Sequence, residues 1–208
     1  MKFRRKSDET DLETDVEAAV EDVSPATGPF DAEDAPADGV PRLDLGSLLM
    51  PAIEGFELRL QVDEQTEEVR AVMLATSDGA MELRAFAAPR GGDLWSEIRP
   101  RISAEFAQRG GTATERDGRF GTELLCQVSV KAKDGRTGIQ QSRIIGFNGP
   151  RWMLRATLLG RAAVELDAGS WEDVIEKVVV NRGNQPMPVG IELPLRVPAD
   201  MPAPDSIG

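Results

Sequence analysis

Apolar and polar residues alternate through much of the middle of the chain. Apolar residues occupy every second position of 56–62, with charged or amide residues between them. This period of two predicts a half-buried strand over 53–62. The same pattern predicts strands over 69–76, 80–87, 112–116, 121–133, 139–147 and 151–159. In the last of these, Trp152 falls on the apolar side, so we interpret it as a core anchor. Asp-Gly or Asn-Gly pairs separate several of these segments, as is typical of tight turns between antiparallel strands.

Two segments follow helical spacing instead. After Asp93, a residue type that caps helices, apolar side chains recur every three or four positions as far as Phe106. Pro100 lies inside this segment and should kink or split the helix, because proline lacks a backbone N–H. A second amphipathic helix is predicted to begin with Ser170 as its N-cap. The predicted fold is therefore α+β, with a single antiparallel, meander-rich sheet of about six or seven strands packed with two main helices.

Acidic residues are concentrated at the beginning of the chain. Residues 1–41 contain four basic and twelve acidic residues, a net charge of -8, whereas the rest of the chain carries -4. Large apolar residues are few there, so the segment cannot bury enough surface to offset the entropy of ordering. We therefore interpret residues 1–40 as a disordered acidic tail, 41–197 as a single α+β domain, and 198–208 as a proline-rich flexible C-terminal tail.

The composition removes several kinds of chemistry. The chain has no histidine and one cysteine, so a Ser-His-Asp triad, an HExxH zinc site and an internal disulfide are not available. Glycine motifs that bind phosphate are also missing. Cys126 falls on the apolar side of its strand and is interpreted as an inert core thiol. We predict no catalytic residue, metal site or cofactor, although an enzyme based on a carboxylate or a lysine is left open.

No signal peptide or transmembrane segment is predicted. The basic first residues are followed by polar and acidic ones, and the longest apolar stretch, about 45–53, is shorter than the roughly 20 residues of a spanning helix. We expect a cytoplasmic location. Weak contact with an anionic membrane surface is a further expectation for the basic start, through Lys2, Arg4, Arg5 and Lys6.

The last third of the chain carries a recognisable series of segments. They are GFNGPRWMLR at 146–155, GRAA at 160–163, VVVNRG at 178–183, PMP at 186–188 and LPL at 193–195. In these segments, and most specifically in GPRWxLR, the chain resembles an actinobacterial family of unknown function over roughly residues 40–198. The resemblance implies no activity, cofactor or catalytic residue. The order of strands and helices is also similar to a PsbP-like sandwich, a fold used mainly by non-enzymatic accessory proteins.

A mildly basic sheet face is the candidate binding surface. If the apolar side of every strand faces the helices, the opposite side collects Arg59, Arg84, Lys131, Arg143, Arg151 and Arg155 against Glu57, Asp63, Glu82 and Glu123. From this face, extended by one later arginine, we select Arg143, Arg151, Arg155 and Arg182 as binding residues. Ile145 and Phe147 share the side of Arg143, which argues against including it.

This face would contact an anionic partner in competition with the protein's own acidic tail. The alternative is a solvated face of Arg–Glu pairs, each worth well under ~1 kcal/mol when exposed. Nucleic acid is disfavoured as the partner because the face offers few aromatic side chains for base stacking.

The sequence favours a non-enzymatic interaction or accessory module that binds an unidentified protein partner. The alternative is an enzyme or a small-ligand-binding protein with a pocket between sheet and helices. A deep pocket with convergent polar groups would favour this alternative, whereas a filled core and a flat basic face would favour the interaction module.

Overall fold

The computed structural model of the protein describes residues 27–63, 65–66, 68–131, 135, 137–165 and 169–198. Most of the predicted acidic tail and all but the first residue of the predicted C-terminal tail lie outside these residues. So do the four N-terminal cations with the expected membrane contact, which are Lys2, Arg4, Arg5 and Lys6.

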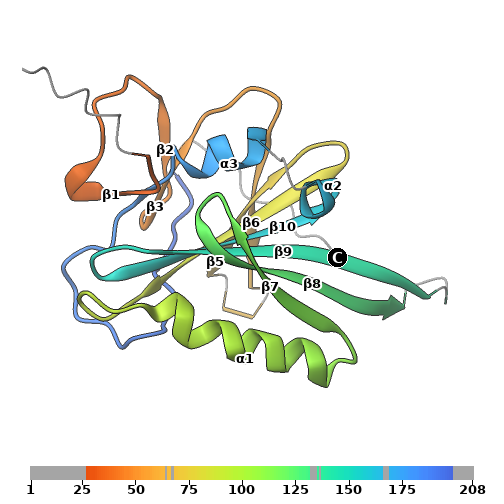
Figure 1. The fold of residues 1–208 in the computed structure, drawn as a ribbon. Coiled ribbons are helices and arrows are strands. Elements are labelled where there is room, and N and C mark those ends of the chain that lie inside the picture. The colour runs from red at the N-terminus through yellow and green to blue at the C-terminus, as the bar shows by residue number, and fades with distance from the viewer. Residues whose placement is uncertain are drawn as a thin grey trace, which may run out of the picture.

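The alternating segments form one large antiparallel sheet (Figure 1). Its strands are β4 (Glu57–Val62), β5 (Val69–Ala75), β6 (Gly79–Ala87), β7 (Thr112–Gly118), β8 (Gly121–Lys131), β9 (Thr137–Asn148) and β10 (Trp152–Gly160). The order across the sheet is β4-β5-β6-β10-β9-β8-β7. Two meanders are therefore joined where β6 pairs with β10, for example at Ala85 and Leu154. The seven predicted strands and their meander connections are confirmed.

A second, smaller sheet corrects the prediction of a single sheet. It contains β1 (Phe30–Asp31), β11 (Val179–Val180), β3 (Leu48–Pro51) and β2 (Arg42–Asp44), in that order. These strands are two to four residues long, too short to display a period of two. Moreover, β1 pairs in parallel with β11 from the far end of the chain, and local sequence carries no signal for such a pairing.

Within the described residues, three α-helices accompany the sheets, rather than the two main helices predicted. They are α1 (Leu94–Gln108), α2 (Arg161–Val164) and α3 (Gly169–Ile175). The side chain of Asp93 accepts a hydrogen bond from the Ser96 N–H, which confirms the predicted cap of α1. Pro100 does not split α1 into two helices. Ser170 lies within the first turn of α3 instead of preceding the helix.

The large sheet is covered on both faces over its middle strands. Figure 1 shows α1 against one face, and the small sheet with α3 against the other. On the side of the small sheet, Trp152 and Leu154 of β10 pack in one cluster with Leu48 of β3 and Val174 of α3. On the other side, Met153 of the same strand packs with residues of α1. The assumption of one solvated face therefore does not hold for β10.

Part of the segment assigned to the acidic tail packs against the domain. Phe30–Asp31 forms β1, and Ala32–Asp34 forms a short 3-10 helix, η1. Both precede residue 41, where the sequence analysis placed the start of the domain. The boundary between tail and domain remains a prediction.

The free cysteine provides a test of the core on the α1 side. Cys126 is 1% exposed, and burial raises the pKa of its thiol to about 11. At pH 8 only about one thiol in a thousand is then a thiolate, the reactive form. We expect a thiol-specific chromogenic reagent to label the folded protein far more slowly than the denatured protein. Equal labelling rates for the two would contradict this packing.

Candidate binding site

The four predicted binding arginines do not share one face of the sheet. Arg143 of β9 lies opposite Leu158 of β10, whereas Arg155 lies opposite Gly146. Directly opposite residues point to the same side of an antiparallel sheet, and neighbouring residues on a strand point to opposite sides. Arg143 therefore points toward the small sheet, and Arg155 points toward the face that α1 partly covers.

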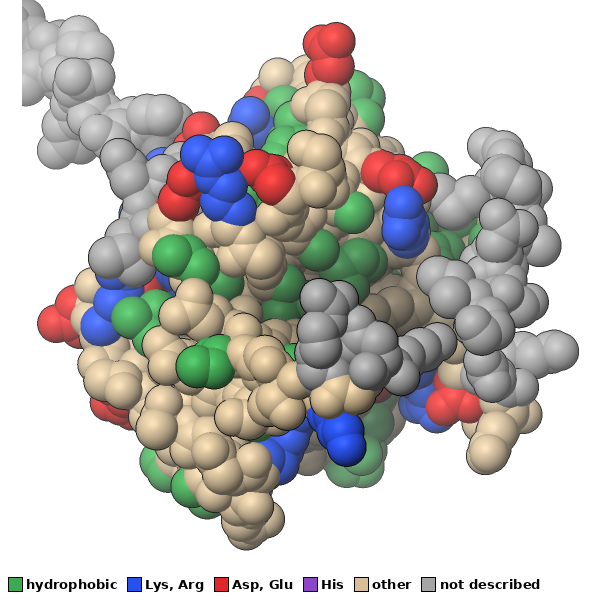
Figure 2. Space-filling model, turned by 90° about the vertical axis from the view of Figure 1, so that its right-hand side faces the viewer, with side chains coloured by type: hydrophobic (Ala, Val, Ile, Leu, Met, Phe, Trp, Pro, Cys, Tyr) green, Lys and Arg blue, Asp and Glu red, His purple; other side chains and the backbone are tan. Residues whose placement is uncertain are grey.

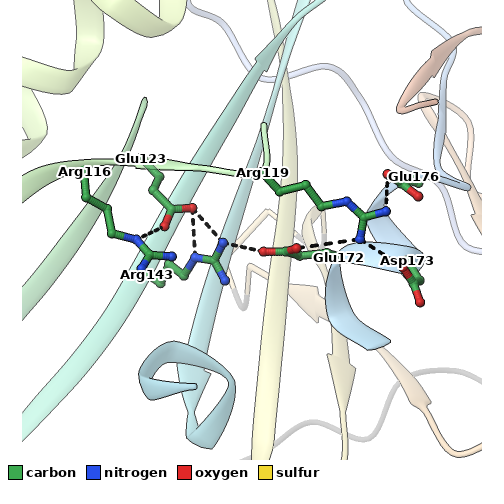
Figure 3. Close-up of polar contacts among 7 residues, drawn as sticks. All are labelled: Arg116, Arg119, Glu123, Arg143, Glu172, Asp173 and Glu176. Atoms are coloured by element: carbon green, nitrogen blue, oxygen red, sulfur yellow. Dashed lines mark hydrogen bonds and ion pairs between the residues drawn. The ribbon is translucent and has the colours of Figure 1, made fainter. Parts of the chain in front are cut away.

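Arg143 belongs to a buried charge network and not to a binding surface (Figure 3). Its side chain is 0% exposed, and its guanidinium lies 2.8 Å from Glu123 and 2.5 Å from Glu172. Glu123 also pairs with Arg116 of β7. Burial alone would lower the pKa of Arg143, but hydrogen bonds to the two glutamates outweigh it and hold the pKa above its ordinary value. A permanent cation inside the core is thereby matched by carboxylates.

The network connects the sheet to α3. Glu172 lies on α3, and Arg119, in the turn between β7 and β8, approaches the same carboxylate at 3.7 Å. Arg119 also pairs with Asp173 at 3.1 Å and with Glu176 at 2.6 Å. Figure 3 shows these groups as a chain of alternating charges that leads from β7 to the helix. Arg143 therefore lies on the same side of its strand as apolar residues because it joins the sheet to α3 through Glu172.

Arg155 is also largely removed from solvent. Its side chain is 25% exposed and lies 3.8 Å from Glu82, and its guanidinium carbon is 5.3 Å from the centre of the Phe86 ring. Burial lowers the pKa of Arg155 below its ordinary value. The stacked guanidinium offers little surface to a partner.

Other charges on the sheet are neutralised by neighbouring residues. Arg59 pairs with Glu57 at 2.7 Å, and Arg84 pairs with Glu82 and Glu192 at 2.9 and 2.8 Å. Figure 2, which shows one face of the molecule, has basic side chains beside acidic ones at several places. The flat basic face that the sequence predicted is therefore broken up into ion pairs.

Arg151 and Arg182 are the two predicted residues that the structure brings together. Both line a cleft of about 160 Å³, which Asp31, Glu33 and Asp34 also line. The guanidinium of Arg182 donates to the carbonyl oxygens of Gly183 and Gln185 at 3.3 and 2.8 Å, and its buried Nε has no partner within the described part of the chain. Among the described residues, neither arginine has a carboxylate within ion-pair distance.

The parallel pairing of β1 with β11 creates this cleft. Phe30 pairs with Val179, and Asp31 with Val180, so both chains run in the same direction. The residues after each strand therefore emerge at the same end. The acidic helix η1 follows one strand, and Arg182 follows the other, which places both at the cleft.

The β9–β10 hairpin contributes Arg151 and is held by the N-terminal segment. Trp152 is 2% exposed, and its indole N–H donates to the Asp31 carboxylate at 2.6 Å. Gly149 is required in the turn because a side-chain Cβ there would lie 2.0 Å from the Trp152 ring. The expectation that Trp152 is a core anchor is confirmed. The sequence did not identify Asp31 as a residue of the site. The available signal was its neighbour Phe30, a large apolar residue in an acidic stretch.

A larger recess of about 470 Å³ lies on the other side of the hairpin, at the start of α1. Its polar groups bond largely to one another: Asn148 donates to Asp93 at 2.6 Å and accepts from the Trp95 N–H at 3.1 Å. Hydrogen bonds from Ser96 are the main reason why the pKa of Asp93 is lowered. These contacts attach α1 to the hairpin. The described residues hold no group of three or more potential metal ligands.

Fold and cleft together define a two-sheet α+β protein whose candidate site lies beside one hairpin of the large sheet. The chain belongs to the family described as "Protein of unknown function (DUF3710)", which matches residues 28–203. The predicted membership of a family of unknown function is thereby confirmed. No curated protein matches the chain. None of the described helices has the length and apolar character that crossing a membrane requires.

Among solved structures, the chain is similar to that of cyanobacterial PsbP (CyanoP) from Synechocystis sp. PCC 6803. The sequence identity is 11%, and the match covers 74% of this chain and 99% of that chain with a TM-score of 0.36. The likeness is too low to support any statement about function.

Replacing Arg143 should destabilise the protein strongly. In Arg143→Met, Glu123 and Glu172 lose their common partner within the core, and breaking a buried ion pair in this way costs about 3–5 kcal/mol. Chemical denaturation measures the change in the free energy of unfolding. The matched control, Arg161→Met, removes an exposed ion pair with Glu165 and should cost less than about 1 kcal/mol. Equal losses in the two variants would contradict the role of the network.

Replacing Asp31 should loosen the N-terminal segment. Asp31→Ala leaves the indole N–H of Trp152 without its acceptor, and losing a hydrogen bond to a charged group costs about 1.5–3 kcal/mol. Asp34→Ala removes a nearby carboxylate that lines the same cleft, and should change stability by less than about 0.5 kcal/mol. Thermal unfolding followed by tryptophan fluorescence compares the two. An Asp31→Ala variant as stable as Asp34→Ala would refute this anchoring.

Proposed function

We propose that the protein is a cytoplasmic, non-enzymatic interaction module that binds an acidic segment of a protein partner at the cleft between Arg151 and Arg182. The observation that carries the proposal is the convergence of these two arginines without a carboxylate partner among the described residues. Guanidinium groups bind carboxylates through charge-assisted hydrogen bonds, which are among the stronger polar contacts of proteins. A buried free cysteine is in keeping with a reducing compartment.

The acidic wall of the cleft would act as a competitor for this partner. Glu33 and Asp34 line the same cleft as the two arginines, so their negative charges lower its affinity for any anionic ligand. The segment that carries them is attached through the two residues of β1 and the Asp31–Trp152 hydrogen bond. Removing the negative charges of Glu33 and Asp34 should therefore strengthen binding of the partner, whereas removing the two arginines should weaken it.

The alternative function, binding of a small ligand, would use the recess of about 470 Å³ at the start of α1. Its polar side chains converge, which favours such a ligand, but Asp93 and Asn148 are already bonded to each other. A ligand there would have to displace these bonds. At the cleft, by contrast, Arg151 and Arg182 donate only to backbone carbonyl oxygens and have no carboxylate partner among the described residues, so we favour the interaction module.

An oligoglutamate peptide is a suitable probe for the cleft. Arg151→Gln combined with Arg182→Gln should weaken binding of the peptide by about tenfold or more, because each substitution removes a guanidinium that would donate a charge-assisted hydrogen bond to it. Glu33→Gln combined with Asp34→Asn should strengthen binding several-fold. Titration calorimetry at low and high salt measures both effects, and salt should weaken binding in each case.

The matched control replaces two exposed arginines of α1 and its C-terminal cap, Arg101→Gln with Arg109→Gln. This change alters the net charge equally and should leave peptide affinity nearly unchanged at moderate salt. Equal weakening in both double variants would mean that only the net charge attracts the peptide. That result, or no binding by the unmodified protein, would overturn the proposal.

A further inference from the structure

One edge of the large sheet is open in the described part of the chain. β4 is the last strand on its side, and none of the described strands pairs with its outer edge. At the other end of the sheet, α1 packs beside β7. Unpaired strand edges readily pair with a further strand, so proteins commonly block them or use them as interfaces.

The open edge borders an apolar recess of about 410 Å³ between the two sheets. Leu58 of β4 and Phe56 just before it contribute to the lining, together with Ile53 and Met50. Leu58, Phe56 and Ile53 are only partly buried. An extended segment laid against β4 would remove this apolar surface from water as it completes the backbone hydrogen bonds of the edge.

We propose that this segment is β4 of a second copy of the chain, paired antiparallel about a two-fold axis at Leu58. In this arrangement Leu58 faces Leu58 of the second copy on the side of the recess, and Phe56 faces Leu60. The two large sheets become one continuous sheet. A two-fold interface uses the same surface twice, so each contact away from the axis occurs in duplicate.

The charges of β4 select the second copy and its register. Glu57 and Arg59 point to the side away from the recess and are 64% and 55% exposed. With the axis at Leu58, Glu57 faces Arg59 of the second copy, and Arg59 faces Glu57. An axis at Glu57 or at Arg59 would place two like charges directly opposite each other, which is destabilising. The strand is therefore complementary to itself in one register.

Charge reversal tests the interface. Analytical ultracentrifugation of the full chain should show a reversible monomer–dimer equilibrium. Glu57→Arg alone places two pairs of arginines across the axis, and Arg59→Glu alone places two pairs of glutamates there. Each variant should have a dissociation constant raised by about tenfold or more. An equimolar mixture of the two variants restores opposite charges at both pairs, and should dimerise within about threefold of the unmodified chain.

Arg109→Glu is the control for net charge, because Arg109 is exposed at the end of α1. It should dimerise as the unmodified chain does. Unfolding curves should show that all variants are folded, since both β4 side chains are more than half exposed. A chain that stays monomeric at high concentration would overturn the proposal. So would a dimer that both single variants leave unchanged, or a mixture that fails to recover.

Discussion

The burial of Arg143 is the constraint on which the arrangement of the two layers depends. A guanidinium buried between the large sheet and α3 must be paired, and Glu123 and Glu172 pair with it at 2.8 and 2.5 Å. Glu172 belongs to α3, so the ion pair determines where this helix lies on the large sheet. The chain that leaves α3 enters β11 within a few residues. The position of β11, and with it that of Arg182, therefore follows from a charge in the core.

The small sheet brings together the segments that line the candidate site. Its β1 and β11 run in parallel, so an acidic segment from the beginning of the chain and a basic segment from near its end emerge side by side. Asp31 fastens the first of these to the β9–β10 hairpin through Trp152. The hairpin supplies Arg151 in turn. Three parts of the chain that are far apart in sequence thus meet at one cleft, and Asp31, which lines the cleft, also joins two of them.

Charge has different roles in different parts of this molecule. The alternating chain of charges from Arg116 to Glu176 joins elements together, and its middle members Glu123, Arg143 and Glu172 are buried. Elsewhere on the sheet, Arg59 and Arg84 are each matched by a carboxylate of the same strand, and Arg84 also by Glu192. Only at the cleft do two arginines meet without a carboxylate partner among the described residues. The net charge of -12 therefore says little about the local potential that a partner would experience.

The sequence by itself determined the seven strands of the large sheet, the start of α1 and the core position of Trp152. These features depend on local periods, caps and turns, which neighbouring residues specify. It also indicated, through Ile145 and Phe147, that Arg143 does not fit a solvated face. Only the tertiary structure decided that a second sheet exists, that Asp31 reaches Trp152, and which arginines share a cleft. These features depend on pairings between distant segments and on strands of two to four residues, whose energies come from packing rather than from local pattern.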